Sequence, residues 1–459
     1  MAECRLTGRI VTPGNPEYEL AREEFNTRYN LFPCIINFCQ NAKDVSNAIC
    51  WARKRKIKFR IRTGRHSYEA YSSLDNGLVI DISEINYVKV DHKKNTARLG
   101  AGSLLFPLYQ ELYEKGYTIP GGTCPSVGLS GLTLGGGWGM LTRPFGLLSD
   151  QLLELEMVDA KGNIDVANKK KNSDLFWASQ GGGGGNFGVV TSFVFNLVPI
   201  KNVAVFNITW DWKGFEPVVK AWQKWAPFTD IRLTAIIDLL TKEKGELRAL
   251  GEFIGSPSEL RRLLTPLIEA YPPKIVEVKK VSYIHAVEIF GGRMPGMEEY
   301  AVSHGDPDAH PFKNTGAFAK NLLPSEGIKI LKHYLANAPS SENKVQLQAL
   351  AGRVREIQPN ETAFVHRKAL FSLLYITKWE EGQDREAKTN TKWVENMRDA
   401  LLPFADGAYV NFHDNCIPNW LEQCYGSNLS RLIRVKTKYD PENLFCFPLG
   451  IPVQGIFEW

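Results

Sequence analysis

The first 120 residues mix two patterns of apolar residues. Helical spacing predicts two helices, at residues 43–58 and 104–115. In the first helix Val45, Ile49 and Trp51 share one face, and Asp44 or Ser46 is suited to begin it. Short runs rich in apolar side chains predict strands at residues 58–62, 78–82 and 96–99. Strands and helices that alternate in this way are typical of a βαβ arrangement.

The pattern changes near residue 200 and again near residue 405. Beyond residue 200, the alternating segments Leu233–Leu240 and Leu247–Phe253 predict strands, and Pro257–Tyr271 predicts helical cover on one face. Turn-rich sequence with many glycines returns near residue 405. We therefore expect an α+β chain with three stretches, at residues 1–200, 201–404 and 405–459.

Composition and charge exclude several classes of partner. The net charge of +5 over 459 residues is spread along the chain, and the densest basic cluster, Arg53–Lys58, is too short to indicate nucleic acid. No apolar run reaches the roughly 18 residues that a membrane-spanning helix needs. The first residues do not form a signal peptide, so a cytoplasmic location is expected. The eight cysteines lack zinc-type spacing and predict free thiols and no metal site.

Four segments have patterns that suit binding of a ring system or a phosphate. The first is Arg62-Thr63-Gly64-Arg65-His66-Ser67-Tyr68, directly after a predicted strand. Backbone N–H groups in such a turn, with arginine beside them, suit a pyrophosphate. A tight turn with a surface histidine is the plainer interpretation of the same residues.

The second segment, residues 121–139, interleaves glycines with Val, Leu and Trp, so its main chain can pack on a flat ring. The alternative is a nicotinamide-dinucleotide loop, but Gly128 and Gly131 supply only fragments of that fingerprint, and Pro120 precedes them. The third segment, residues 174–191, has five consecutive glycines between apolar flanks. The fourth comprises residues 408–412 and 439–448.

In this order, the four segments resemble the covalent FAD flavoproteins of the vanillyl-alcohol oxidase type, which have a PCMH-type FAD-binding domain. Within them the chain is similar to the berberine bridge enzyme-like and sugar-oligosaccharide oxidase branch. The resemblance implies a two-part FAD-binding domain from residues 1–200, to which residues 405–459 return. Residues 201–404 would form a substrate-binding domain with a large antiparallel sheet backed by helices.

The same resemblance assigns two attachment residues. His66 matches a histidine bonded to the flavin, and Cys124 matches a second bond found in bicovalent members. It also implies FAD contacts at Arg62, Thr63, Gly64, Arg65, His66, Ser67, Gly122, Cys124, Ser126, Val127, Gly128, Gly131, Gly135, Gly136, Gly137, Gly139, Val190, Tyr409 and Asn411. Two positions depart from the family pattern. Arg65 replaces a usual glycine, and Leu374 replaces a usual acid or glutamine, with Ser372 as the nearest polar residue.

The resemblance further implies an oxidase that transfers a hydride from a CH–OH group of a sugar or other alcohol to FAD, with O2 reduced to H2O2. Tyr409 matches a catalytic tyrosine, and the small Val127 matches the oxidase pattern of oxygen access. Cationic helpers of the base would be Arg353, Arg355 or Lys378. Substrate contacts are expected from Tyr375 and Trp379. Four further aromatic or imidazole side chains suit either ring stacking or the core: Trp210, Trp212, Tyr283 and His285.

Other functions remain compatible with these residues. The same scaffold supports C–N oxidation or oxidative ring closure of a natural product. A protein that holds FAD without turnover is a second alternative, for which the missing acid at Leu374 is the support. A nicotinamide dehydrogenase is the most distant possibility.

Overall fold

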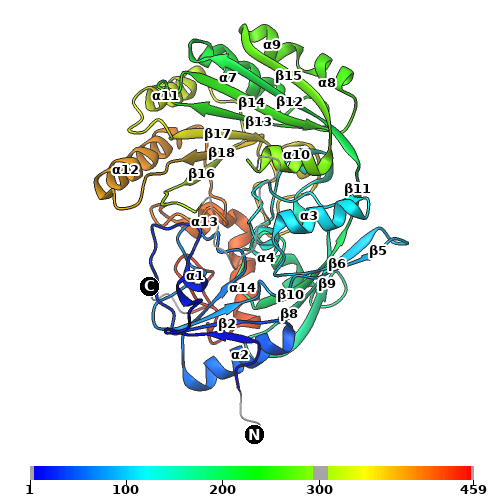
Figure 1. The fold of residues 1–459 in the computed structure, drawn as a ribbon, viewed down its shortest axis with the longest axis vertical. Coiled ribbons are helices and arrows are strands. Elements are labelled where there is room, and N and C mark those ends of the chain that lie inside the picture. The colour runs from blue at the N-terminus through cyan, green and yellow to red at the C-terminus, as the bar shows by residue number, and fades with distance from the viewer. Residues whose placement is uncertain (1–4, 293–308, 456–459) are drawn as a thin grey trace.

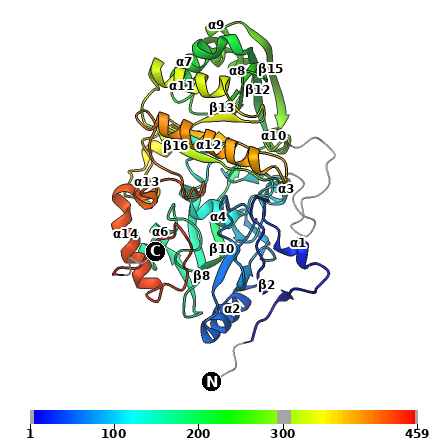
Figure 2. The same cartoon turned by 90° about the vertical axis from the view of Figure 1, so that its left-hand side faces the viewer.

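The computed structural model describes residues 5–292 and 309–455. In Figure 1 the lower half contains the N-terminal residues together with the C-terminal helices, and the upper half contains one large sheet with its helices. The view in Figure 2 shows the same division, with helices α13 and α14 returning to the lower half. The chain enters the large sheet at strand β12 and leaves the upper half after helix α12.

Two sheets form the lower half. The first has the order β1 (Arg9–Val11), β2 (Ile35–Phe38), β4 (Leu78–Asp81) and β3 (Phe59–Arg62), with parallel pairing of β2, β4 and β3. The second is antiparallel, with the order β5 (Val88–Asp91), β6 (Thr96–Gly100), β10 (Val189–Asn196), β8 (Leu152–Val158) and β9 (Ile164–Asn168). Strands β7 (Tyr117–Thr118) and β11 (Val198–Pro199) pair separately.

The upper half is a seven-stranded antiparallel sheet with helices on one face. Its order is β15 (Pro273–Ser282), β12 (Asn202–Asp211), β14 (Glu246–Phe253), β13 (Leu233–Leu240), β17 (Lys344–Ala349), β18 (Phe371–Ile376) and β16 (Thr315–Ala319). Helices cover the side away from the lower half (Figure 1), and a continuous apolar core fills the space between them and the sheet. The other face of the sheet therefore points toward the lower half.

The helices of the lower half are α1 (Tyr18–Arg22), α2 (Ala42–Arg55), α3 (Leu105–Glu114), α4 (Leu129–Leu134), α5 (Thr142–Phe145), α6 (Ser173–Ala178), α13 (Trp420–Tyr425) and α14 (Leu429–Tyr439). Those of the upper half are α7 (Phe215–Trp225), α8 (Pro257–Leu263), α9 (Thr265–Ala270), α11 (Ser325–Ala336) and α12 (Asp384–Leu401). Helix α10 (Tyr283–Phe290) lies on the other face of the sheet, where it packs against α3 and joins the core of the lower half. Short 3-10 turns occupy Leu148–Gln151, Trp212–Gly214, Gly352–Glu356 and Gly426–Asn428. In residues 5–292 and 309–455, no helix is long and apolar enough to cross a membrane.

The helices and strands expected from the sequence are present, with small shifts at their ends. The helix expected at residues 43–58 is α2, which begins one residue earlier. Its N-cap is Asn41, not Asp44 or Ser46, and the Asn41 side chain accepts from the Asp44 N–H. The single helix expected at Pro257–Tyr271 is two short helices. Pro266 occupies the first turn of the second, where no N–H is needed.

One expectation about the cysteines is wrong. Cys50 is disulfide-bonded, although its spacing from other cysteines in the sequence gave no sign of pairing. Spacing along the chain does not measure distance in space, which is why the sequence alone missed it. Thiols remain at Cys34, Cys39, Cys416, Cys424 and Cys446. Cys4 lies outside the described residues.

A buried ion triad joins the three stretches of the chain. Lys313 Nζ lies 2.5 Å from Glu69 Oε1 and 2.7 Å from Asp414 Oδ1, and all three side chains are at most 3% exposed. The Tyr29 hydroxyl donates to Glu69. Burial lowers the pKa of Lys313, but the two adjacent carboxylates outweigh it and raise the pKa overall. The ammonium group therefore stays charged and holds the two halves together.

We predict that Lys313→Met lowers the free energy of unfolding by about 3–5 kcal/mol, because it leaves two buried carboxylates without their counter-ion. Lys320→Met is the matched control. Lys320 pairs with Asp406 at 3.0 Å, also between the upper half and the C-terminal segment, but both side chains are about half exposed. The control should change stability by less than about 1 kcal/mol. Urea unfolding followed by tryptophan fluorescence measures both, and equal effects would contradict the prediction.

Candidate functional site

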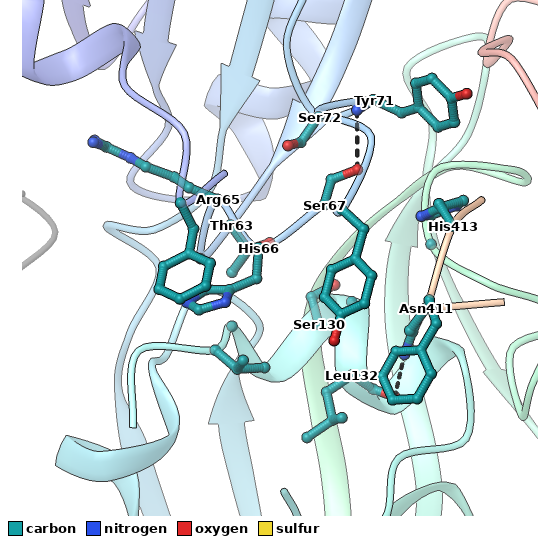
Figure 3. Close-up of a pocket in the computed structure, with 18 of the residues that line it drawn as sticks. Thr63, Arg65, His66, Ser67, Tyr71, Ser72, Ser130, Leu132, Asn411 and His413 are labelled. Carbon is teal, nitrogen blue, oxygen red and sulfur yellow. Dashed lines mark hydrogen bonds between the residues drawn. The ribbon is translucent and has the colours of Figure 1, made fainter. Parts of the chain in front are cut away.

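A cavity of about 480 Å³ lies between the two halves and is lined by all three stretches of the chain. The four segments singled out in the sequence meet there. Of the expected cofactor-contacting residues, those that line it are Thr63, Gly64, Arg65, His66, Ser67, Gly122, Cys124, Val127, Gly128, Gly131, Val190, Tyr409 and Asn411. Figure 3 shows His66 and Ser67 from one loop facing Ser130, Leu132 and Asn411 across this space.

The first loop follows strand β3 and carries His66 into the cavity, but its arginines do not act as expected. Arg62 does not line the cavity. Its guanidinium is buried in ion pairs with Asp81 at 2.7 Å and Glu24 at 3.3 Å, and these pairs take up the charge that was expected to face a phosphate. Successive side chains of a strand point to opposite faces of the sheet, and the Arg62 side chain points to the face that packs against helix α1.

Arg65 adopts a φ of +63°, a region that favours glycine, which is the residue the family pattern has at this position. Its side chain extends away from the centre of the cavity in Figure 3 and donates to the Leu20 carbonyl. Burial lowers the pKa of Arg65 to about 10. Arg65 therefore reaches the cavity wall mainly through its backbone, and backbone N–H groups are the donors that this loop offers to a phosphate.

The second segment brings Cys124 next to His66. Ser126 Oγ lies 2.8 Å from His66 Nε2 and 3.8 Å from Cys124 Sγ. Ser126 itself is buried and does not line the cavity, and Gly135, Gly136, Gly137 and Gly139 also lie behind the wall. These five residues were expected to contact the cofactor. In the structure they lie behind the residues that line the cavity, and their contact with a cofactor stays a prediction.

Much of the cavity wall is bare backbone, as a flat ring system requires. A Cβ added at Gly131 would meet no atom within 4 Å, and one added at Gly184 would have its nearest neighbour at 3.8 Å. Side chains at these positions would project into the cavity. Gly128, Gly185 and Gly188 extend the same wall. The residues present therefore fit a dinucleotide with a planar head group such as FAD.

The C-terminal segment places Tyr409 at the edge of this wall. Tyr409 Oη accepts from the Gly137 N–H at 3.1 Å and from Asn411 Nδ2 at 2.9 Å. Burial raises the pKa of Tyr409, and these two donors act in the opposite direction by stabilising the phenolate. Trp138 packs on Tyr409 with ring centroids 4.0 Å apart and holds its ring in place.

Several residues that line the cavity had not been expected to contact the cofactor or the substrate. Tyr68 and Phe412 stack with centroids 5.3 Å apart, and Phe312 packs edge-on against Tyr68. Gln346 and Gln348 project from strand β17 into the cavity. The sequence carried a signal for these glutamines, because they alternate with buried Val345 and Leu347. Phe25, His310, Phe312 and Asn314 lie in segments without a motif.

The two expected substrate residues do not line the cavity. Tyr375 is completely buried in the core between the upper sheet and its helices. Its strand neighbours Leu374 and Ile376 face the cavity instead, because successive side chains of a strand point to opposite faces. Trp379 lies just beyond this strand, where its N–H donates to the Pro311 carbonyl. The structure therefore places the Tyr375 side chain away from the cavity, and a substrate contact by Trp379 stays a prediction.

The other suggested contacts also lie elsewhere. Trp210 and Trp212 belong to the core of the upper half, Tyr283 packs against α3, and His285 pairs with Glu288.

The expected cationic helpers are surface residues: Arg353 pairs with Glu356 and Lys378 with Glu342, and Arg355 is exposed on the same turn as Arg353. Among the described residues that line the cavity there is no Asp or Glu, and no cluster of the described residues could hold a metal.

Glu252 occupies a separate small cavity of about 20 Å³ behind the Cys124 segment, bounded by Gly121, Gly122 and Thr123. Its Oε1 has no hydrogen-bond partner in the part of the chain that the structure describes. Burial raises the pKa of Glu252 from 4.5 to about 8. The carboxyl is therefore protonated and neutral at pH 7 in the folded protein.

This burial predicts a pH-dependent stability. Between pH 4.5 and about 8 the unfolded chain loses the Glu252 proton while the folded protein keeps it. Stability therefore falls as pH rises through this window and levels off above it. Glu252→Gln should remove this loss and gain up to about 4 kcal/mol over the wild type at pH 8, with little difference near pH 4.5. Glu246→Gln, on the same strand but half-buried, is the control. The free energy of unfolding is measured by urea unfolding at each pH. If it changes with pH in the same way in the wild type and in Glu252→Gln, the prediction is contradicted.

Comparison with known proteins agrees with this geometry. Residues 33–167 match the FAD binding domain family, and residues 408–452 match the family described as berberine and berberine like. The chain is 45% identical to the FAD-linked oxidoreductase YgaK of Bacillus subtilis, over 98% of both chains. It is 39% identical to the FAD-linked oxidoreductase YvdP of the same organism, over 98% of this chain and 99% of that one.

Solved structures show the same fold. BBE-like 1 of Physcomitrella patens superposes with a TM-score of 0.91 at 30% identity, over 98% of this chain and 97% of that one. A chitooligosaccharide oxidase gives 0.90 at 26% identity, and the berberine bridge enzyme of Eschscholzia californica gives 0.88 at 25%, each over 98% of both chains.

Proposed function

Because the chain belongs to the berberine bridge enzyme-like family of FAD-linked oxidoreductases, we propose that it is an oxidase with FAD bonded to both His66 and Cys124. It would transfer a hydride from a CH–OH group of a sugar or other alcohol to the flavin and reduce O2 to H2O2. FAD supplies the hydride acceptor and the reaction with oxygen. The protein supplies binding, orientation and the removal of a proton.

The observation that carries this proposal is the position of the two attachment residues. His66 and Cys124 line the same glycine-walled cavity and lie within hydrogen-bonding reach of one hydroxyl, that of Ser126. Nothing in the sequence requires residues 58 positions apart to meet in this way. Two bonds at neighbouring points would fix a ring in one orientation and prevent loss of the cofactor.

Tyr409 is the base in this proposal. A tyrosine titrates near pH ~10 when unperturbed, so it needs partners that favour the phenolate. The Gly137 N–H and the Asn411 amide are such partners, and they take the place of the cationic helper expected from the sequence. Their dipoles are fixed before substrate arrives, so no reorganisation is needed when the proton moves.

The lining of the cavity favours a neutral substrate. The described lining residues include no carboxylate, so a cationic substrate would find no counter-charge there. Gln346, Gln348 and Asn314 each form a hydrogen bond, with Asp238, Gly139 and Thr377 respectively, and their remaining amide groups can meet hydroxyls. Tyr68, Phe312 and Phe412 offer ring faces. Val127 is small and lines the cavity, which supports access of O2.

The aromatic rings, together with Leu374 and Ile376, also support a second candidate, C–N oxidation or oxidative ring closure of a natural product. A panel of sugars, aromatic alcohols and cyclic amines, followed by peroxide detection, separates the two. A carbonyl or lactone product supports the first, and an iminium or new ring supports the second. A flavin that no member of the panel reduces would contradict both, and a reduced flavin that does not regain its colour in air would contradict the oxidase.

The linkage is tested by acid precipitation of the protein and its variants. We predict that flavin colour stays in the pellet of the wild type, of His66→Ala and of Cys124→Ala, because one bond remains in each single variant. The double variant should release its flavin into the supernatant. Flavin released by the wild type would contradict covalent attachment, and flavin retained by the double variant would contradict these two residues.

The role of Tyr409 is tested by Tyr409→Phe. We predict that the rate of flavin reduction, measured by anaerobic stopped flow with a substrate from the panel, falls by about 100-fold or more, since a positioned base contributes at least this factor. Both flavin bonds should remain. Tyr334→Phe removes a hydroxyl from surface helix α11 and should leave the rate unchanged. A Tyr409→Phe rate equal to that of the wild type would exclude Tyr409 as the base.

A further inference from the structure

The Ser126 hydroxyl occupies the position between the two proposed attachment residues. It lies 2.8 Å from His66 Nε2 and 3.8 Å from Cys124 Sγ, the latter within the longer range of a hydrogen bond to sulfur. Ser126 is 7% exposed, and unlike its neighbours Cys124 and Val127 it does not line the cavity. Its hydroxyl therefore contacts both attachment residues on the side away from the cavity.

The backbone fixes this position on both sides. The Pro125 carbonyl accepts from the Phe106 N–H and the Val127 carbonyl from the Leu105 N–H, each at 3.0 Å. Both donors lie in the first turn of helix α3, where N–H groups have no partner within the helix. The residues before and after Ser126 are thus held by one rigid helix end, and the hydroxyl has little freedom to move.

The His66 side of the contact is equally constrained. A Cβ on Gly64 would lie 2.3 Å from Gly128 N and 2.9 Å from Ser126 O, so at Gly64 the two loops are in direct backbone contact. The His66 ring stacks on Phe25 with centroids 3.9 Å apart. Phe25 is tied to the same loop because its N–H donates to the Arg65 carbonyl. The imidazole is held with Nε2 toward Ser126.

We propose that Ser126 is a positioning residue that relays a proton from the Cys124 thiol to His66. The S–H bond breaks as its proton passes to Ser126 Oγ, and the Ser126 O–H proton passes to His66 Nε2. The products are a thiolate and an imidazolium, and no oxidant or reductant is consumed. The inference rests on the proposed attachment of flavin at both residues.

The relay would prepare Cys124 for bond formation. The thiolate, not the thiol, is the nucleophilic form of cysteine. A nucleophile and its base within hydrogen-bonding reach, with a third group that orients the base, is the usual arrangement for activating such a group. Here Cys124 is the nucleophile, His66 the base reached through Ser126, and Phe25 the group that orients the ring.

The test compares Ser126→Thr with Ser126→Val, which have nearly the same shape and differ in the hydroxyl. Each full-length protein is produced in riboflavin-limited culture and then loaded with FAD. Peptide mass spectrometry of the unfolded protein counts flavin bonded to the His66 peptide, to the Cys124 peptide and to both. The rate of appearance of the Cys124 bond is followed at pH 7 and at pH 9.5.

We expect Ser126→Val to form the Cys124 bond about 100-fold more slowly than the wild type at pH 7, because a positioned proton transfer is lost. Ser126→Thr should restore most of the rate. Raising the pH to 9.5 should narrow the gap between Val and wild type, since the thiol then ionises without help. If the substitutions only disturbed packing, Ser126→Thr and Ser126→Val would form the Cys124 bond equally slowly, and the deficit in rate would not change with pH.

Three results would overturn the relay: a wild-type rate in Ser126→Val, equal slowing of Thr and Val, or a deficit that pH does not change. Each of these leaves a doubly bonded wild type, so the proposed attachment stands while the relay fails. A wild type without a Cys124 bond overturns the attachment and the relay together. One experiment therefore distinguishes failure of the relay from failure of the proposed attachment.

Discussion

The contact between Gly64 and Gly128 sets how closely the two cofactor loops approach. With no side chain on either residue, the loops touch backbone to backbone, and this brings His66, Ser126 and Cys124 within reach of one another. Any Cβ at Gly64 would separate them. The requirement is steric and local, but the proposed covalent chemistry, the orientation of a bound ring and the position of the glycine wall all depend on it.

A second constraint acts across the two halves of the molecule. Each member of the Lys313–Glu69–Asp414 triad is next in sequence to a residue that lines the cavity, namely Tyr68, Phe312, Asn314 or His413. The triad therefore fixes the aromatic side of the cavity from behind. Arg143 adds to this, since its buried guanidinium donates to main-chain carbonyls of residues 227–233 in the upper half. The buried triad and the Arg143 contacts therefore tie the upper half to the other stretches on either side of the cavity.

The sequence predicted the parts of this arrangement that depend on local pattern. Period-two and helical spacing located the strands and helices, and glycine-rich motifs located the loops, including His66, Cys124 and Tyr409. It failed where a tertiary choice decides the outcome. Arg62 could face a phosphate or an interior carboxylate, and only the packing of α1 against β3 decides for the latter. Tyr375 differed from Leu374 only by strand face, which a one-residue register decides. Phe25 and Phe312 reach the site from segments that carry no motif.

The distribution of charge around the cavity explains why a neutral pair of donors is placed at Tyr409. Three buried cations near the wall are paired with carboxylates, Arg62 with Asp81, Lys313 with Glu69 and Arg367 with Asp150. The buried guanidinium of Arg65 instead donates to the Leu20 carbonyl. None of them is available to stabilise a phenolate. The Gly137 N–H and the Asn411 amide act on Tyr409 from a buried position, where hydrogen bonds are stronger than in water. A dipole costs less to bury than a charge. Such a site can favour the phenolate of Tyr409 without attracting an anion that would compete with a neutral substrate.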